Sequence, residues 1–230
     1  MRESEPAFTR LHLIRHAQTD WNRTHTIQGI NDDIPLNAVG LEQTASLANH
    51  LSKHYQIDII YASKAKRAQQ TATLIGSVIN RPVHKTGILN EFDFGIFSGS
   101  CTDEIESKFP DHFYKFRHFM MTNRDQSTPR PEIKGGETSK QVEIRAKAFI
   151  SKILSEHEGK SIAAVTHGTF IRCMLTFLSG KSLQDFIPFW VDNTSISVVD
   201  FFGPVPIIRR VNDTCHLNQG PLEFLFPQLF

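Results

Sequence analysis

The stretch that decides the interpretation of this chain is Leu11-His12-Leu13-Ile14-Arg15-His16-Ala17-Gln18-Thr19-Asp20-Trp21-Asn22. Its first four residues are mostly apolar and predict a short buried strand, which Arg15 and His16 follow directly. In α/β proteins, ligand-binding residues gather where strands end. Arginine presents a charged, planar fork of donors to a phosphate, and neutral imidazole offers a nucleophilic nitrogen. An Arg-His pair is not specific by itself, so its meaning depends on what else the chain carries.

Hydrophobic periodicity in the rest of the chain alternates between helical and extended segments. Helices are expected at about residues 37–54, 65–79, 139–157 and 168–178, and strands at about residues 57–62, 83–88, 161–166, 194–202 and 207–211. Strands that alternate with helices indicate an α/β fold with helices on both faces of one sheet. We therefore predict a single domain, residues 1–230, built as a three-layer α/β/α sandwich with a mainly parallel central sheet.

Two segments depart from this alternation. Residues of about 100–135 are expected to form a helical lid insertion, in which four phenylalanines recur at helical spacing: Phe109, Phe113, Phe116 and Phe119. We favour the interpretation that these rings pack the insertion onto the body of the protein; the alternative is that they line a substrate pocket. The tail, residues 218–230, is strongly apolar and is expected to pack against the body or a partner subunit, which leaves a homodimer open.

Composition narrows the class of protein. The 230 residues are 40% hydrophobic and 21% charged, and the formal net charge is +1. These values are typical of a soluble globular protein and argue against nucleic acid as a partner. We find neither a secretory signal in residues 1–10 nor an apolar run long enough to span a membrane, so no membrane partner is expected. The three cysteines have no Cys-x-x-Cys spacing, which suits a reducing, cytoplasmic compartment.

Three further segments place reactive side chains after predicted strands. His167 follows the apolar strand 161–166, and Gly168 then begins a helix whose free N–H groups suit an anion. Arg67 lies in the first turn of the helix after the strand 57–62. Glu91 lies among aromatic residues, an apolar environment that is expected to raise the pKa of a carboxyl group.

Together these segments resemble the histidine phosphatase superfamily, which is also called phosphoglycerate mutase-like. The matching motifs are Arg15-His16-Ala17-x-Thr19-x-x-Asn22, Gln28-Gly29, Pro35-Leu36-Asn37 with Gly40, Ser63 with Arg67-Ala68-x-Gln70-Thr71-Ala72, Glu91 with Gly95, Gly135-Gly136-Glu137-Thr138, His167-Gly168, and Asn212 with His216-Leu217. They cover nearly the whole chain in the family's order. One residue departs: Ala17 stands where the family usually has glycine, and its extra methyl group is expected to tighten the site or slow the reaction.

The resemblance implies a role for each site residue. His16 would be the nucleophile that forms a phosphohistidine, and Glu91 the proton donor, with Asp93 as the second choice. The phosphoryl oxygens would be held by Arg15, Arg67 and His167. Further substrate-binding residues would be Asn22, Gln28, Gly29, Gly168 and Thr169. Because this scheme counts three fixed cationic groups, it requires neither a metal ion nor another cofactor.

Alternatives remain at the level of residues and of function. Arg15 and Arg67 could instead pair with Asp20 or Glu91, and the two histidines could be core residues. The resemblance favours a phosphomonoesterase that acts on a small phosphorylated metabolite. Cofactor-dependent phosphoglycerate mutases of this family carry a Gly- and Leu-rich stretch after the acid, which residues 94–105 lack. A non-catalytic phosphate-binding or scaffold protein is the third hypothesis. The physiological substrate is not predicted.

Overall fold

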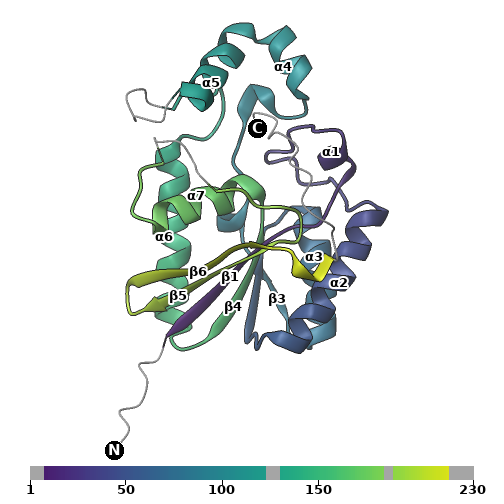
Figure 1. Ribbon diagram of the computed structural model, residues 1–230, viewed down its shortest axis with the longest axis vertical. Helices are drawn as coiled ribbons and strands as arrows, with labels where there is room; N and C mark the ends of the chain where they lie inside the picture. The colour runs from purple at the N-terminus through teal and green to yellow at the C-terminus, as the bar shows by residue number, and fades with distance from the viewer. Residues whose placement is uncertain (1–7, 123–129, 184–188, 218–230) are drawn as a thin grey trace, which may run out of the picture.

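The computed structural model describes residues 8–122, 130–183 and 189–217. The predicted apolar tail therefore lies outside the described residues. Figure 1 shows one central sheet with helices against both of its faces and a helical insertion beyond one end.

The sheet has six strands in the order β3-β2-β4-β1-β5-β6. Their bounds are Val83–Lys85 (β3), Ile59–Ala62 (β2), Ser161–Thr166 (β4), Thr9–Arg15 (β1), Ile196–Phe202 (β5) and Val205–Asp213 (β6). The pairs from β3 to β1 are parallel, whereas β5 and β6 join in antiparallel orientation. The central strands β1 and β4 are buried along most of their length on both faces, as strands covered by helices on both sides must be.

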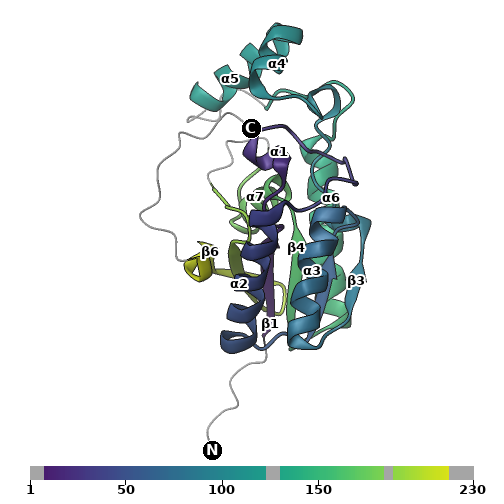
Figure 2. The same ribbon diagram turned by 90° about the vertical axis from the view of Figure 1, so that its right-hand side faces the viewer.

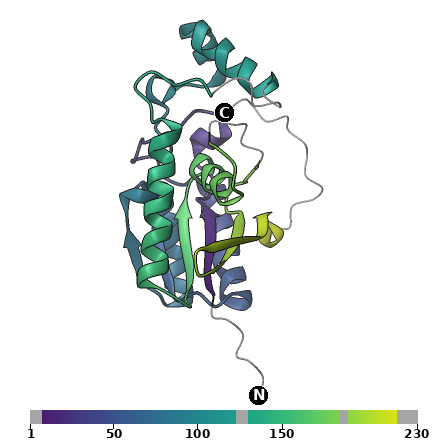
Figure 3. The ribbon, with the colours of Figure 1, turned by 90° about the vertical axis from the view of Figure 1, so that its left-hand side faces the viewer.

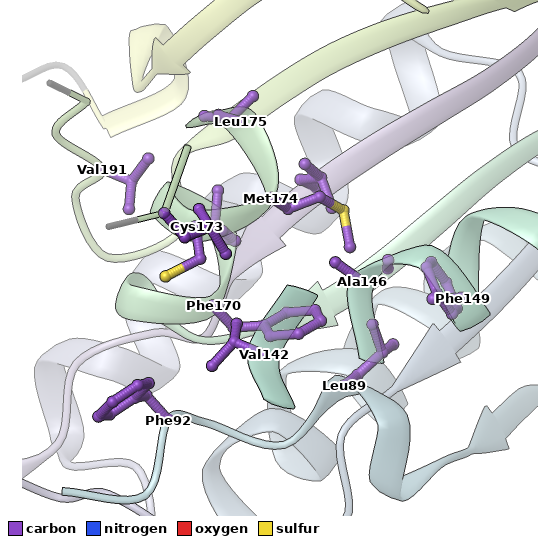
Figure 4. Close-up of a cluster of buried hydrophobic side chains, with 14 of the residues drawn as sticks. Leu89, Phe92, Val142, Ala146, Phe149, Phe170, Cys173, Met174, Leu175 and Val191 are labelled. Carbon is purple, nitrogen blue, oxygen red and sulfur yellow. The ribbon is translucent and has the colours of Figure 1, made fainter. Parts of the chain in front are cut away.

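Two layers of helices cover the sheet. In Figure 2, α2 (Ala38–His54) and α3 (Lys66–Ile79) lie together on one side, and Figure 3 shows α6 (Ser139–Glu156) and α7 (Gly168–Leu178) on the other. Leu47, Leu51 and Ile75 contribute to the core beneath α2 and α3. The core beneath α6 and α7 is more aromatic and includes Phe149 and Phe170 (Figure 4). The predicted α/β sandwich with a mainly parallel sheet is confirmed.

The strand register brings the expected reactive segments to one edge. Arg15, the last residue of β1, is paired with Thr166, the last residue of β4. Ala62, the last residue of β2, is paired with Val165. His16, Ser63 and His167 therefore leave three neighbouring strands at the same end of the sheet.

The insertion consists of α4 (Thr102–Lys108) and α5 (Pro110–Thr122), which lie beyond this end of the sheet, near the short helix α1 (Asp20–Arg23) (Figures 1 and 2). Phe113, Phe116 and Phe119 are almost fully buried, and Phe109 is half-buried. Phe113 and Phe116 belong to the aromatic core that also contains Phe97. The rings thus pack the insertion onto the body, which was the favoured interpretation.

Some boundaries differ from the sequence expectation. The strand predicted at 83–88 ends at Lys85, and a short 3₁₀ helix follows at Gly87–Leu89. The Thr86 side chain accepts a hydrogen bond from the Ile88 amide and so favours the turn over a longer strand. Helix α1 was not predicted; its four residues are held by a capping box between Thr19 and Asn22.

Candidate active site

A cavity of about 490 Å³ opens at the carboxyl ends of β1, β2 and β4. Nine of the ten predicted site residues line it: Arg15, His16, Asn22, Gln28, Gly29, Arg67, Glu91, Gly168 and Thr169. The tenth, His167, lies behind the wall, and its ring centroid is 5.1 Å from that of His16. Two other cavities, of about 480 and 460 Å³, are lined by none of these ten residues.

His16 is held in one orientation by its own loop. Its Nδ1 lies 2.8 Å from the carbonyl oxygen of Ala17, which can only accept, so Nδ1 carries the proton and Nε2 keeps a lone pair. Burial lowers the pKa of His16 well below its usual value, and the charges of Arg67 and Arg15 lower it further. A neutral imidazole with a free ring nitrogen therefore lines the cavity, as nucleophilic attack requires.

His167 differs from the expectation of a fixed cationic group. Its Nε2 donates to Ser63 Oγ at 2.8 Å, because that hydroxyl donates its own proton to Asn90. Burial, with Arg67 as the second cause, lowers the pKa of His167 well below its usual value, so the ring is neutral when the site holds no anion. Its Nδ1 is buried without a partner among the described residues. Of the three groups expected to be fixed cations, only Arg15 and Arg67 carry a charge in this state.

Arg15 and Arg67 donate to backbone carbonyls instead of carboxylates. Arg15 Nη1 donates to the Val191 carbonyl at 2.9 Å, and Arg67 donates to the carbonyls of Gly29 and Asn31 at 2.9 and 2.5 Å. Neither forms an ion pair with a described residue, so the alternative pairing with Asp20 or Glu91 is wrong. The Nε atoms of both are buried without a partner in the described part of the chain. Burial lowers the pKa of Arg67 to about 10, which still leaves it charged at neutral pH.

Glu91 is bound by the start of α7. Its Oε1 accepts hydrogen bonds from the amides of Phe92 and Phe170, at 2.8 and 3.0 Å, and its Oε2 accepts one from Thr169 at 3.2 Å. The environment of the carboxyl group is therefore more polar than the neighbouring aromatic residues suggested. Asp93 instead accepts from the amide of Gly95 and caps a turn. It is not among the residues that line the cavity.

Three residues that line the cavity can also make contacts within the protein: Asn22, Gln28 and Gly29. Asn22 Oδ1 accepts from the amide and hydroxyl of Thr19, and so is occupied by the capping box. Gly29 has φ +51° and offers its carbonyl to Arg67. The buried Oε1 of Gln28 has no partner among the described residues.

Two small residues of these motifs, Ala17 and Gly168, differ in what their positions require. Ala17 is fully buried and does not have a positive φ, so its backbone needs no glycine, and its side chain is not part of the cavity wall. Gly168 is different, because a Cβ atom there would lie 3.2 Å from Arg15 Nε. The glycine therefore lets the arginine lie directly against the start of α7.

Several residues that the sequence interpretation did not single out complete the site. Arg145 on α6 forms hydrogen bonds of 2.6 and 2.7 Å with both oxygens of Glu137. The same guanidinium donates to the carbonyls of Ile88 and Asn90, at 2.7 and 2.9 Å, and reaches that of Glu91 at 3.5 Å. The loop that carries Glu91 is thus fixed by one half-buried ion pair.

The far wall comes from residues 189–193. Asn193 Nδ2 donates to the His16 carbonyl at 2.9 Å. Asp192 accepts from the side chain of Asn212 at 2.7 Å, which accounts for the Asn212 motif. Trp190 and Arg172 also line the cavity. The signal for Arg172 was its position four residues after Gly168, which places both on one face of α7.

Metal-binding clusters and membrane-spanning helices are both absent from the described residues. No group of three or more His, Cys, Asp or Glu side chains could hold a metal ion. Within the same residues, no helix has the length and apolar character needed to cross a membrane. Cys101, Cys173 and Cys215 are free thiols.

The fold and the histidine-centred cavity define a class of α/β enzyme that handles phosphate esters. The sequence profile of the histidine phosphatase superfamily (branch 1) matches residues 11–214, and the chain belongs to this family. The resemblance found in the sequence is confirmed.

Known proteins are similar to this chain over almost its full length. The chain is 32% identical to phosphoserine phosphatase 1 of Hydrogenobacter thermophilus, covering 93% of this chain and 97% of that protein. It is 31% identical to a broad-specificity phosphatase of Saccharomyces cerevisiae, with 96% and 91% covered. A phosphoserine phosphatase structure from Entamoeba histolytica superposes with a TM-score of 0.76 at 26% identity, covering 91% of this chain and 99% of that one. The chain is accordingly a phosphatase of this family, a phosphoric monoester hydrolase.

Proposed function

We propose that the chain is a metal-independent phosphomonoesterase that forms a phosphohistidine at His16 and acts on a small phosphorylated metabolite. The observation that carries the proposal is the state of His16. Its Nδ1 proton is committed to the Ala17 carbonyl, and its neutral Nε2 faces a cavity next to two arginines. Cavities of this volume suit small ligands.

In the first step, His16 Nε2 forms a bond to phosphorus as the bond from phosphorus to the ester oxygen breaks. Arg15 and Arg67 balance the charge of the transferring group. Their unpartnered Nε atoms support this role, because a buried donor without a partner is costly until an acceptor arrives. His167, whose ring centroid lies 5.1 Å from that of His16, has an unpartnered Nδ1; an ester that binds as its monoanion can pass its proton to this nitrogen, which then donates a hydrogen bond to a phosphoryl oxygen.

Glu91 supplies the proton that the leaving oxygen requires. Its Oε2 accepts one backbone hydrogen bond and Oε1 accepts two, so Oε2 is the freer oxygen to carry a proton. In the second step a water oxygen attacks phosphorus, the bond to His16 breaks, and Glu91 takes the proton from that water. Inorganic phosphate and the original protonation states result.

The test is direct detection of the intermediate. Protein mixed with p-nitrophenyl phosphate and quenched in alkali within milliseconds is expected to gain the mass of one HPO₃ group, on the peptide that contains His16. The modification should be lost in acid, as for any phosphoramidate. His16→Ala is expected to show neither the modification nor turnover, a loss of several orders of magnitude. A variant that keeps more than about a tenth of wild-type turnover would exclude covalent catalysis by His16.

A further inference from the structure

Arg172 is a cation in the cavity wall that the transfer of the phosphoryl group does not use. It lies on the same face of α7 as Gly168 and Thr169, and all three line the cavity. Side chains on a helix tilt toward its N-terminus, and one turn spans about 5.4 Å. The guanidinium of Arg172 is therefore directed toward the part of the cavity that adjoins the start of α7.

Its surroundings leave most of this guanidinium available. Nε donates to the Phe189 carbonyl at 2.8 Å, and the guanidinium carbon lies 5.9 Å from the centre of the Trp190 ring. Within residues 8–122, 130–183 and 189–217, no carboxylate forms an ion pair with Arg172. Burial lowers the pKa of Arg172 to about 10, so it remains charged at neutral pH. A buried charge without an opposite charge is costly to maintain in a structure.

The neighbouring charges do not supply the missing partner. Arg130 is a second nearby cation: its guanidinium lies 5.2 Å over the Phe92 ring, and its Nη1 is buried without a partner in the described part of the chain. The nearby carboxylate is Glu91, which is already bound by the amides of α7. Asp192 also lines the cavity, but its two oxygens accept from Trp190 and Asn212. Neither carboxylate forms an ion pair with Arg172, so its guanidinium keeps donors for an anion that comes from outside the chain.

We infer that Arg172 binds a second anionic group of the substrate, a carboxylate or a further phosphate close to the phosphoester. The site then selects phosphomonoesters that carry a second anionic group over those that carry none. The inference rests on the proposed function, because it takes the transferred phosphoryl group to lie at His16. The cavity of about 490 Å³ also has room for more than a phosphate group. A guanidinium suits the role because it binds planar carboxylate and phosphate oxygens with two donors.

The test uses pairs of substrates that differ in one charged group. O-phospho-L-serine and O-phosphoethanolamine differ by a carboxylate, as do 3-phosphoglycerate and glycerol 3-phosphate, apart from a hydroxymethyl group in its place. Fructose 1,6-bisphosphate and fructose 1-phosphate form the arm for a second phosphate. Wild-type kcat/KM is expected to be at least about tenfold higher for the anionic member of the carboxylate pairs or of the phosphate pair. The arm in which this occurs identifies the anion.

Arg172→Gln is expected to lower kcat/KM for the preferred anionic substrate by about ten- to hundredfold. For the member of the pair that lacks the second anionic group, kcat/KM of Arg172→Gln should stay within about threefold of the wild-type value, since that substrate has no group for Arg172 to bind. Arg172→Lys keeps the charge but not the fork and should fall between. Arg209→Gln is the matched control: it removes one positive charge from β6, outside the cavity, where the side chain is 60% exposed. It should change neither substrate.

Two results would overturn the inference while leaving phosphohistidine formation intact. One is a wild-type enzyme that treats both members of every pair alike. The other is an Arg172→Gln enzyme that loses the same factor on both members. Should Arg172→Gln fail to fold, the wild-type comparison and Arg172→Lys decide the question. Failure of the proposed function is recognised separately, by absence of turnover with all of these esters and with p-nitrophenyl phosphate.

Discussion

Arg145 and Glu137 form a two-pronged ion pair, with distances of 2.6 Å for Nε–Oε1 and 2.7 Å for Nη2–Oε2, directly behind the loop that carries Glu91. The side chains are only 22% and 12% exposed, so the pair is shielded from water and salt. Because the same guanidinium donates to the carbonyls of Ile88 and Asn90, it fixes the backbone on which Glu91 stands. Arg145 is therefore expected to position the acid without touching substrate.

Arg145→Lys is expected to lower kcat by about tenfold or more for an alkyl phosphate and clearly less for p-nitrophenyl phosphate, with little change in KM. A lysine keeps the charge but lacks the planar guanidinium that binds both oxygens of Glu137 and also reaches two carbonyls. The measurement is the ratio of kcat for the two esters. Lys147→Ala, which breaks an exposed ion pair with Glu143 on the same helix, is the control. Equal losses on both esters would reduce Arg145 to a structural residue.

Glu91→Gln is expected to lower kcat by about 10²–10⁴-fold for an alkyl phosphate, which needs a proton on its leaving oxygen. The loss should be much smaller for p-nitrophenyl phosphate, because nitrophenolate departs without one. Steady-state kinetics on both esters measure the difference. Asp93→Asn is the matched control and should leave this ratio unchanged, since Asp93 caps a turn away from the cavity wall. If the ratio moves in Asp93→Asn and not in Glu91→Gln, the two residues exchange roles.

The free energy of unfolding is expected to fall as the pH drops below about 6.5. Burial lowers the pKa of His12 to about 4 and those of His16 and His167 well below the usual value. The unfolded chain then binds more protons than the native one between these pKa values, so stability that is present above 6.5 is lost toward pH 4. For His12 alone the loss amounts to roughly 3 kcal/mol at pH 4.

Urea titrations at pH 7.5, 6.0 and 5.0 in phosphate-free buffer measure this dependence. His12→Asn removes one of the buried rings, at a position that does not line the cavity, and should make the dependence of stability on pH shallower. If the free energy of unfolding depends on pH equally in wild type and in His12→Asn, His12 is not buried in its neutral form.

Hydrolysis of p-nitrophenyl phosphate is expected to survive prolonged treatment with EDTA. Arg15 and Arg67 already supply the charge that a metal ion would contribute to phosphoryl transfer. Activity is compared before and after chelation, and again after addition of Mg²⁺ or Zn²⁺. A loss that either ion restores would contradict the metal-independent mechanism.

Water is expected to be the main acceptor of the phosphoryl group. Incubation with 3-phosphoglycerate and catalytic 2,3-bisphosphoglycerate should release inorganic phosphate and little 2-phosphoglycerate. NMR of phosphorus follows both products at once. Interconversion of the phosphoglycerates much faster than hydrolysis would identify a mutase instead.

The sequence predicted the sandwich and the gathering of the candidate site residues at one edge of the sheet because both depend on local signals. His16 and His167 each follow an apolar strand directly, and parallel strands must end side by side. The β5–β6 hairpin also has a local signal, because only Gly203 and Pro204 separate the two strands, whereas the antiparallel pairing of β5 with the distant β1 has none. The short β3 depended on a side-chain contact of Thr86 with a nearby amide, which hydrophobic periodicity does not report.

The contacts that tune the site were beyond prediction for a related reason. Arg145 contacts the backbone of Glu91, which lies 54 positions earlier in the sequence, and no local pattern near either residue predicts this contact. The neutral state of His167 follows from burial and from the charge of Arg67, which only the folded arrangement provides. For the same reason, the sequence could not show that the side chain of Ala17 is buried away from the cavity wall.

The residues that line the cavity come from segments as distant in sequence as residues 15 and 193, so an anion bound there contacts both halves of the chain. Such an anion binds the native protein but not the unfolded chain, and at a hundred times its dissociation constant it adds about 2.7 kcal/mol of stability. Product phosphate, and phosphate buffer, would thus act as a thermal stabiliser. A mutation in the wall that weakens phosphate binding loses part of this added stability, so its deficit in melting temperature would be larger in phosphate than in its absence, and melting curves of variants have to be compared in both.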